Sequence, residues 1–226
     1  MNSSSRLLIF DLDGTVADTL EAIREAVNLT MRRFGWPERT YDEVRLAVGN
    51  GARKIVERSM PKDCTSDPAL VDRALAEYDA LYGQTYLHTD RCYPGIPETV
   101  AELKKRGFRL AMLSNKQDPY VRSLAAQLFP AGTFDLVRGQ TDKPKKPDPT
   151  VPLEFIAALH LQPSRCVMIG DSSVDIQTGK NAGMLTVGCS WGFRPRSSLE
   201  EAGADYIVDR PEELLTLPFV SSEPNR

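Results

Sequence analysis

The feature that most restricts the fold of this chain is a series of short apolar runs with helical patterns between most of them. The runs occupy residues 7–10, 108–113, 134–137, 166–169, 185–189 and 206–208. Runs of this length that end at turn residues are typical of strands buried on both faces. Strands that alternate with helices form a parallel sheet covered by helices on both sides. The sequence therefore predicts an α/β fold with a doubly wound, Rossmann-like core.

One long region breaks this alternation. Between residues 19 and 87 the sequence carries helical signals and no convincing strand pattern. Residues 19–34 are amphipathic, Thr40 and Glu43 fit a capping box, and further helices are expected at 52–59 and 68–82. We therefore expect residues 17–88 to form an all-helical domain, inserted into a core made of residues 1–16 and 89–226.

The composition is that of an ordinary soluble globular protein. The chain has 226 residues, of which 41% are apolar and 26% charged, and its formal net charge is −3. A charge this small gives no sign of a surface for nucleic acid or anionic membranes. The apolar run near the N-terminus is far too short for a signal peptide or a membrane span. We expect a cytoplasmic monomer or homodimer that binds neither nucleic acid nor membrane.

The metal-ligating residue types favour a hard cation. The four cysteines are widely spaced and form no CxxC pair, so we expect free thiols rather than a zinc site or a disulfide framework. Histidine is also scarce, since the chain has only His88 and His160. A metal site would therefore have to use oxygen ligands, which favours Mg²⁺.

The strongest chemical signal is the segment Asp11-Leu-Asp-Gly-Thr15, directly after the first apolar run. If the strand continues through it, Asp11 and Asp13 lie on one face, and Gly14 allows a sharp turn. Two adjacent carboxylates repel unless a cation or a shared proton relieves them. The pair therefore suits a metal together with one nucleophile and one acid–base group. The alternative is an Asp-Gly turn that caps a helix.

Two further polar segments are candidates for phosphate binding. Ser114 and Asn115 end the second apolar run, where a hydroxyl, an amide and free backbone N–H groups can hold a phosphate oxygen. A simple Ser-Asn turn or helix cap is the common alternative. Residues 143–149 form a proline-rich loop with three lysines. One lysine there can offset the charge of a phosphoryl group, whereas Lys143 and Lys145 are better interpreted as solvated.

A second pair of aspartates follows the run that ends at residue 169. Asp175 lies four residues after Asp171, one helical turn away if a helix begins near Ser173. Two carboxylates so placed can complete an oxygen-ligated Mg²⁺ site. Alternatively, Asp175 is a helix N-terminal carboxylate favoured by the macrodipole. All four signals fall at the carboxyl ends of predicted strands, where sheets of this type bind ligands.

Taken together and in order, these motifs resemble those of the haloacid dehalogenase superfamily of phosphohydrolases. The matching segments are FDLDGT at 10–15, SN at 114–115, KPDP at 146–149 and GDSSVD at 170–175. The resemblance covers nearly the whole chain, and it is closest to phosphoglycolate phosphatase-like members. The inserted helical region lies where that family places its first type of cap domain.

The resemblance implies a magnesium-dependent phosphatase that forms an aspartyl-phosphate. In the family, the residue matching Asp11 attacks phosphorus, and the residue matching Asp13 protonates the leaving group and then activates water. The side chains of Asp11 and Asp171 and the backbone carbonyl of Asp13 are implied to bind Mg²⁺. Asp175 is implied to support the ion directly or through water.

The resemblance also implies the residues that bind the phosphoryl group. Lys146 matches the family's lysine because it immediately precedes Pro-Asp-Pro, and it binds phosphate with Ser114, Asn115 and Thr15. A carboxylate at Asp13 separates phosphatases from dehalogenases, which need no such acid. Thr15 also resembles the hydrolases rather than the sugar-phosphate mutases.

Substrate choice is expected to depend on the inserted region. The segment with Gly49, Asn50, Gly51 and Arg53 is similar to the cap loop of phosphoglycolate phosphatases, and an arginine fork suits a substrate carboxylate. The alternative is that the glycines merely separate two helices and that Arg53 is solvated. We expect a small phosphorylated metabolite, 2-phosphoglycolate, as substrate.

Other readings remain. Pyrophosphatases and sugar or nucleotide phosphatases share every motif. A phospho-accepting receiver domain is a more distant alternative, because receivers lack both the insertion and the acid at Asp13. A binding module without activity is disfavoured by the intact chemical residues. Asp18 and Thr19 are interpreted as helix-capping residues, and residues 191–194 as packing at the edge of the site.

Overall fold

The computed structural model describes residues 6–88 and 91–221. Within these residues, six strands form one parallel sheet in the order β3-β2-β1-β4-β5-β6. The strands are β1 (Leu7–Phe10), β2 (Arg109–Gln117), β3 (Leu136–Gln140), β4 (Cys166–Gly170), β5 (Leu185–Cys189) and β6 (Tyr206–Val208). The chain reverses its direction of winding between β1 and β4, and such a switch point is where open α/β sheets bind ligands. The predicted doubly wound core is confirmed.

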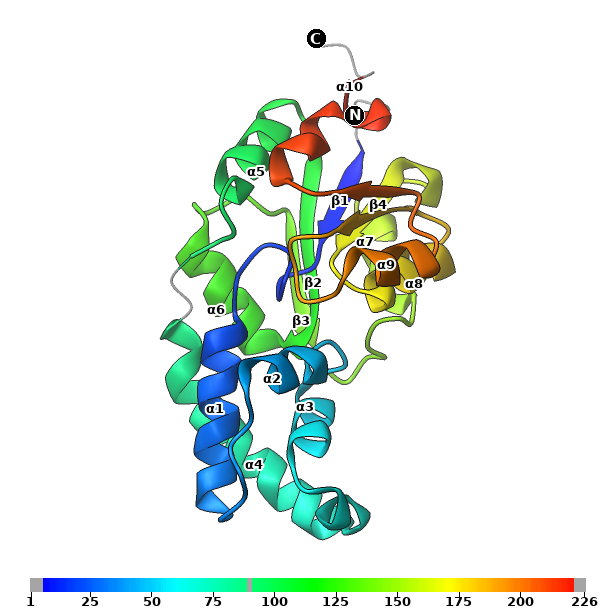
Figure 1. Cartoon of the computed structure of the whole chain (residues 1–226). Helices are drawn as coiled ribbons and strands as arrows, with labels where there is room; N and C mark the ends of the chain where they lie inside the picture. The colour runs from blue at the N-terminus through cyan, green and yellow to red at the C-terminus, as the bar shows by residue number, and fades with distance from the viewer. Residues whose placement is uncertain (1–5, 89–90, 222–226) are drawn as a thin grey trace.

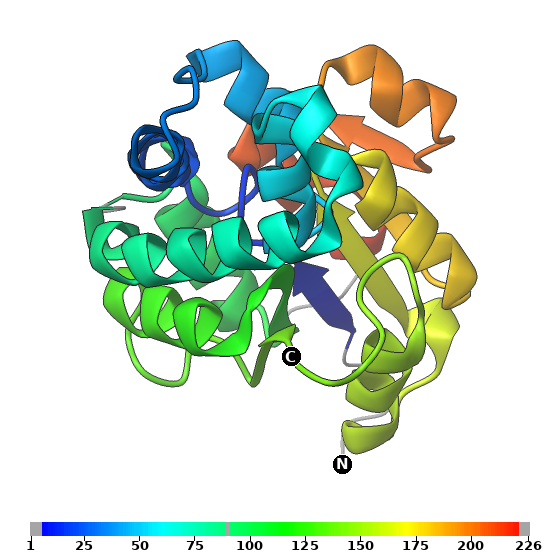
Figure 2. The ribbon, with the colours of Figure 1, turned by 90° about the horizontal axis from the view of Figure 1, so that it is seen from below.

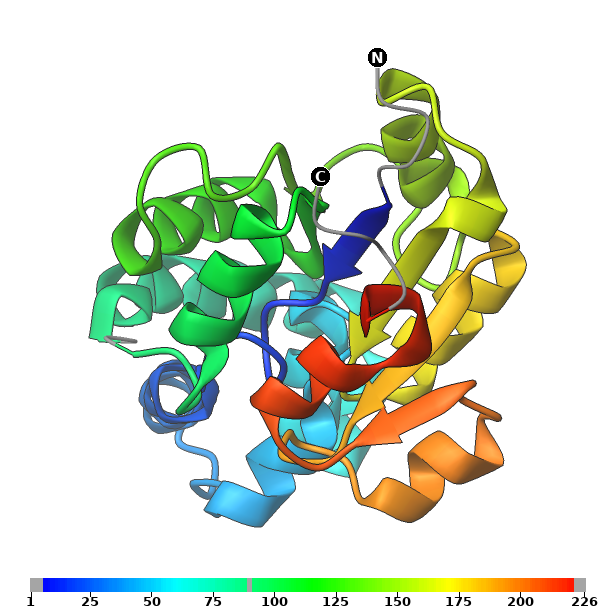
Figure 3. The same cartoon turned by 90° about the horizontal axis from the view of Figure 1, so that it is seen from above.

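Both faces of the sheet are covered by helices (Figure 3). The side chains of β1 alternate, so that Leu8 and Phe10 join one apolar cluster and Leu7 and Ile9 join the other. The first cluster includes α5 (Ile96–Lys105) and α6 (Asp118–Leu128), and the second includes α7 (Thr150–Ala158). The remaining core elements are η3 (Pro163–Arg165), α8 (Ser173–Asn181), α9 (Arg196–Glu201), η4 (Pro211–Thr216) and α10 (Pro218–Ser221).

Strand β2 is longer than its apolar run predicts. It continues beyond Leu113 to Gln117, which pairs with Gln140 at the end of β3 after an irregularity in the register. The prediction of a strand over 108–113 was therefore too short, and that over 134–137 began too early. The physical reason is that the last residues of β2 are polar yet buried, since Ser114 is only 4% exposed and Asn115 only 6%. A search for apolar runs does not detect a strand that ends inside a polar site.

The segment between β1 and α5 folds into a group of helices with its own apolar cluster. We call it the helical group: α1 (Leu20–Arg33), α2 (Tyr41–Ala47), α3 (Ala52–Ser59), η1 (Lys62–Ser66), α4 (Pro68–Thr85) and η2 (Tyr86–His88). The predicted capping box of Thr40 and Glu43 is confirmed at the start of α2. Figures 1 and 2 place this group beyond the carboxyl ends of the strands.

Two further expectations bear on the class of protein. The four cysteines are free, as predicted, with Cys166 and Cys189 buried and Cys64 and Cys92 half-buried. Among residues 6–88 and 91–221, no helix combines the length and apolarity that crossing a membrane requires.

Candidate active site

Three neighbouring strands bring the predicted site residues to one edge of the sheet. In the middle of the sheet, Phe10 of β1 is in register with Met112 of β2 on one side and Ile169 of β4 on the other. Asp11 follows β1, Ser114 lies two residues past Met112, and Asp171 follows β4. The side chains that follow these paired positions therefore meet at the switch point of the sheet.

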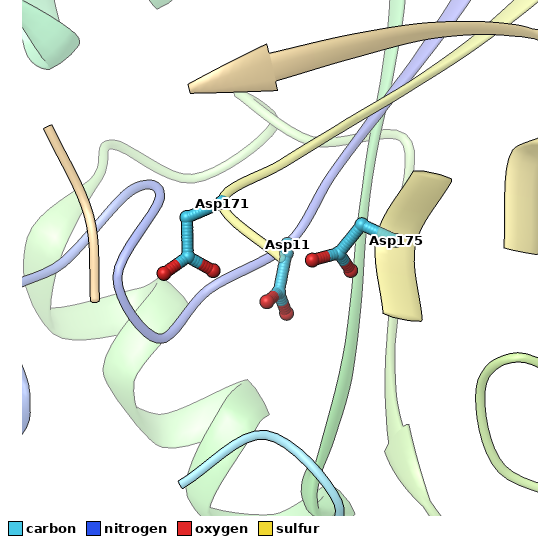
Figure 4. A group of neighbouring side chains, drawn as sticks. All are labelled: Asp11, Asp171 and Asp175. Atoms are coloured by element: carbon cyan, nitrogen blue, oxygen red, sulfur yellow. The ribbon is translucent and has the colours of Figure 1, made fainter. Parts of the chain in front are cut away.

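Three buried carboxylates converge at this edge. Asp11, Asp171 and Asp175 each have an oxygen within 4.8 Å of the others' oxygens (Figure 4). Asp11 Oδ1 is buried, and the Lys146 ammonium lies 2.8 Å from it. A set of buried, convergent carboxylate oxygens fits a hard divalent cation such as Mg²⁺. We call Asp11, Asp171 and Asp175 the acid cluster.

Burial and mutual repulsion raise the pKa values of carboxyl groups in the acid cluster. Burial raises the pKa of Asp11 to about 7, with Asp175 and Asp13 adding to the rise and Lys146 opposing it. Burial also raises the pKa of Asp171 well above its ordinary value, and Asp175 and Asp11 add to that shift. A cation bound among these groups would favour their charged forms and reverse both shifts.

Lys146 supplies positive charge to the acid cluster. It is 4% exposed, and its Nζ lies 2.8 Å from Asp11 Oδ1 and 2.7 Å from Asp175 Oδ1. Burial alone lowers the pKa of this ammonium, but the two carboxylates outweigh burial and raise it. Lys146 therefore stays charged beside Asp11. By contrast, Lys143 pairs with Glu154.

Asn115 lines the cavity and also holds the loop that carries Lys146. Its Oδ1 accepts a hydrogen bond from the backbone N–H of Lys146 at 2.9 Å, and its Nδ2 donates to the Lys146 carbonyl at 3.0 Å. The same Nδ2 donates to the Gly49 carbonyl at 3.2 Å. The amide thus joins β2, the lysine loop and the segment between α2 and α3. Ser114 accepts a hydrogen bond from the Lys116 backbone N–H.

Asp175 lies in the first turn of a helix, as one interpretation of its position predicted, and its carboxylate also belongs to the acid cluster. The helix α8 begins at Ser173, as expected, and Asp175 completes a capping box with Ser172. Its Oδ2 accepts hydrogen bonds from the Ser172 N–H and Oγ, while Oδ1 accepts from Lys146 Nζ. Gly170 makes room for this carboxylate, because a Cβ there would lie 2.2 Å from Asp175 Cγ.

Asp13 has two partners that the sequence did not predict. Its Oδ1 lies 2.6 Å from Lys116 Nζ and accepts a hydrogen bond from Thr19 Oγ1 at 2.7 Å. Thr19 occupies the N-cap position of α1, as predicted, but its side chain makes no capping bond there and bonds Asp13 instead. Lys116 was missed although it directly follows Ser114 and Asn115. A lysine at the polar end of a buried strand is the signal that would have found it.

The segment 191–194 supports the site directly and does more than pack at its edge. The Phe193 N–H donates to Asp171 Oδ2 at 2.6 Å, and Trp191 Nε1 donates to the Thr15 carbonyl at 3.0 Å. Thr15 itself is fully buried, and its Oγ1 has no hydrogen-bond partner among the described residues. Gly14 adopts a φ of 82°, and a Cβ there would lie 2.4 Å from Asp171 Oδ2. These contacts fix the orientation of Asp171.

The site opens into a cavity of about 640 Å³ between the sheet edge and the helical group, including the part open to solvent. Its lining includes Asp11, Asp13, Ser114, Lys146 and Asp171. It also includes three tyrosines, which we call the aromatic wall: Tyr78, Tyr82 and Tyr120.

The segment between α2 and α3 contributes its glycines to the cavity and directs Arg53 elsewhere. Gly49 and Gly51 line the cavity, whereas Asn50 and Arg53 are not among its described lining residues. Arg53 is the second residue of α3, and its guanidinium pairs with Asp72 on the outer surface. Ala52 and Ile55, three residues apart on one face of α3, line the cavity instead.

Comparison with known proteins identifies relatives along the whole chain. The family model described as "Haloacid dehalogenase-like hydrolase" matches residues 8–189. A phosphoglycolate phosphatase of Vibrio vulnificus (strain CMCP6) is 33% identical over 223 residues, which cover 96% of this chain and 97% of the relative. A phosphoglycolate phosphatase of Aquifex aeolicus (strain VF5) is 33% identical over 217 residues, which cover 94% of this chain and 96% of the relative.

Solved structures share the same architecture. A crystal structure from Lactobacillus delbrueckii subsp. bulgaricus, described as a candidate phosphoglycolate phosphatase, superposes with a TM-score of 0.85. It is 30% identical and covers 95% of this chain and 97% of its own. CbbY from Rhodobacter sphaeroides, solved in complex with phosphate, has a TM-score of 0.73 and 26% identity, with coverage of 93% and 96%.

Proposed function

The chain belongs to the haloacid dehalogenase-like hydrolase family, and from this membership we propose that it is a magnesium-dependent phosphatase of 2-phosphoglycolate. The single observation that carries the proposal is that Asp11, Asp13, Lys146 and Asp171 line one cavity. These four residues supply a nucleophile, an acid, a cation and a metal ligand within one site. The two curated relatives named above, both phosphoglycolate phosphatases, support the choice of substrate.

The chemistry assigns distinct roles to the two aspartates of the first motif. The Asp11 carboxylate attacks phosphorus, so that an oxygen–phosphorus bond forms as the bond to the leaving oxygen breaks. Asp13 donates a proton to that leaving oxygen and later takes one from the water that releases phosphate. Lys146 and Ser114 bind the phosphoryl oxygens, and Lys146 also offsets the charge that builds up beside Asp11.

The acid cluster would hold Mg²⁺. We propose the side chains of Asp11 and Asp171 and the backbone carbonyl of Asp13 as ligands, with Asp175 as support, because Asp175 already accepts bonds from Lys146 and Ser172. When bound, the ion neutralises part of the negative charge shared by the carboxylates and the phosphoryl group.

The helical group would act as a cap over the site. We propose that residues 17–88 form the cap domain and that residues 1–16 and 89–226 form the catalytic core. The cap supplies Gly49, Gly51 and two tyrosines of the aromatic wall to the cavity. A cap that closes over bound substrate excludes water from the reacting groups.

A phosphate-release screen of purified protein tests the proposal. The panel contains 2-phosphoglycolate, pyrophosphate, sugar phosphates and nucleoside monophosphates, each with Mg²⁺ and with excess chelator. We expect the highest kcat/KM for 2-phosphoglycolate, and we expect chelator to abolish activity until Mg²⁺ is restored. A clear preference for pyrophosphate or a sugar phosphate would refute the proposed substrate. Full activity in chelator would refute the role of the metal.

A further inference from the structure

We propose that Lys116 binds the carboxylate of the substrate and thereby selects phosphoesters whose leaving group carries a carboxylate. This inference rests on the proposed function and names the residue that makes the site selective. Lys116 lies near the end of β2, lines the cavity, and has a side chain that is only 7% exposed. A lysine held this deeply in a substrate cavity calls for an anionic partner.

The ammonium of Lys116 is positioned with donor capacity to spare. Its Nζ lies 2.6 Å from Asp13 Oδ1, donates to the Tyr82 hydroxyl at 2.8 Å, and sits 4.8 Å from the centre of the Tyr82 ring. An ammonium has three N–H donors, and these contacts use two of them. The Tyr82 ring in turn packs edge-on against Tyr120, with centroids 5.1 Å apart. The aromatic wall therefore fixes the ammonium at the cavity.

The other cations in or near the cavity are held by partners within the protein. Lys146 contacts two carboxylates of the acid cluster. Arg194 donates to the carbonyls of Arg45, Leu46 and Val48. Arg53 pairs with Asp72 outside the cavity. Of the cavity-lining cations in the described chain, Lys116 is the one whose ammonium contacts the proposed acid, Asp13.

The chemistry of the substrate places its carboxylate near Lys116. In the proposed reaction, Asp13 protonates the oxygen that bridges phosphorus and carbon. The carboxylate of 2-phosphoglycolate is attached to that same carbon, so its oxygens lie within a few bond lengths of the bridging oxygen. Lys116 Nζ lies 2.6 Å from Asp13 Oδ1 and lines the same cavity. An ammonium–carboxylate contact there is a charge-assisted one.

The ratio of the kcat/KM values for two substrates tests the role proposed for Lys116. One substrate is 2-phosphoglycolate, and the other is 2-hydroxyethyl phosphate, which replaces the carboxylate with a hydroxymethyl group. The variant Lys116→Met keeps the length of the side chain and its packing on Tyr82 but removes the charge. Any damage to Asp13 affects both substrates and cancels in the ratio of their kcat/KM values. We expect Lys116→Met to lower that ratio at least about tenfold, mainly through KM for 2-phosphoglycolate.

Two controls separate selectivity from folding. Arg53→Met removes a cation on the outer surface and should leave the ratio unchanged. Tyr82→Phe keeps the ring but removes the hydroxyl that holds Lys116, and it should lower the ratio about two- to fivefold, a smaller loss than that of a charge. If Lys116→Met is unfolded at the assay temperature, the ratio measured for Tyr82→Phe carries the test.

The outcomes also distinguish this inference from the proposed function. Wild-type protein that hydrolyses 2-phosphoglycolate with a ratio unaffected by Lys116→Met and Tyr82→Phe would overturn the role of Lys116 and leave the proposed function standing. Wild-type protein that hydrolyses other phosphoesters but not 2-phosphoglycolate would overturn the proposed function, and this inference with it. A drop in the ratio for Arg53→Met alone would transfer the role to Arg53.

Discussion

Asp11 combines two demands that conflict. As the proposed nucleophile it has to be ionised, yet burial beside Asp175 and Asp13 raises its pKa to about 7. A carboxyl whose pKa is higher in the folded than in the unfolded chain costs stability as pH rises from its ordinary value through the folded value. The residues that make the reaction possible are therefore those that strain the protein when no cation is bound.

Substitution of Asp11 by asparagine should separate these two effects. Asp11→Asn removes the nucleophile, and we expect turnover of 2-phosphoglycolate to fall at least about a thousandfold. It also removes a buried charge, so that in chelator at pH 8 the variant should unfold at a higher temperature than the wild type. At pH 5, where Asp11 is largely protonated in the folded state, the difference in melting temperature should shrink. Calorimetry at both pH values measures it, and a variant less stable than wild type at pH 8 would contradict the interpretation.

At the scale of elements, β2 gathers more of the site than its apolar run predicts. Its buried start was predicted from sequence, as were β5, β6 and α3 with their bounds. Its polar end was not, because buried polar residues are stabilised by tertiary partners that no local pattern reveals. Asn115 is held by the Lys146 backbone and Lys116 by Asp13 and Tyr82. The acid cluster was predictable because each aspartate either follows an apolar run or lies in the first turn of a helix. Lys116 was not singled out, since its partners are distant in sequence.

The same strand is anchored to its neighbours by Asp135. This carboxylate accepts bonds from the Leu110 N–H at 2.9 Å and Lys104 Nζ at 3.0 Å, and it lies 3.0 Å from Arg109 Nε. Burial raises the pKa of Asp135, but these partners outweigh burial and lower it overall. The lowered pKa means that the stability it contributes is present above the unfolded value and is lost as pH falls through the folded value.

We therefore expect Asp135→Asn to destabilise the fold at pH 7 by about 1–2 kcal/mol, because a charged acceptor is replaced by a neutral amide. Urea denaturation should show that the gap between variant and wild type narrows as pH falls below about 4, the ordinary value of an aspartate. Asp142 is an exposed aspartate that lies after β3, so Asp142→Asn is a matched control. A gap that stays constant down to pH 3 would show that the charge of Asp135 is not what stabilises β2.

On the scale of the whole molecule, the helical group and the core meet through a reciprocal pair of arginines. Arg194 of the core donates to three carbonyls at the end of α2, at 2.6, 3.2 and 2.6 Å. Arg45 of α2 donates back to the Phe193 carbonyl at 2.8 Å. The Phe193 N–H holds Asp171. One short segment therefore connects the position of the helical group to the orientation of a proposed metal ligand.

Loss of this connection should weaken substrate binding without changing selectivity. We expect Arg194→Met to raise KM about fivefold for 2-phosphoglycolate and for 2-hydroxyethyl phosphate alike, because the end of α2 and the Gly49 segment lose their support. Hydrogen exchange of the amides of residues 45–49 should become faster in the same variant. An increase of KM confined to 2-phosphoglycolate would instead identify Arg194 as a contact of the substrate carboxylate.

The polar end of β2 has a consequence for how such enzymes diverge. Ser114, Asn115 and Lys116 are consecutive, yet each serves a different part of the site: the phosphoryl group, the lysine loop and the leaving group. If Lys116 binds the variable part of the substrate as proposed, a codon change at this one position would alter which metabolites are accepted while the acid cluster and Lys146 stay in place. New substrate ranges in chains of this architecture can therefore arise by drift at a single strand residue, before any remodelling of the cap.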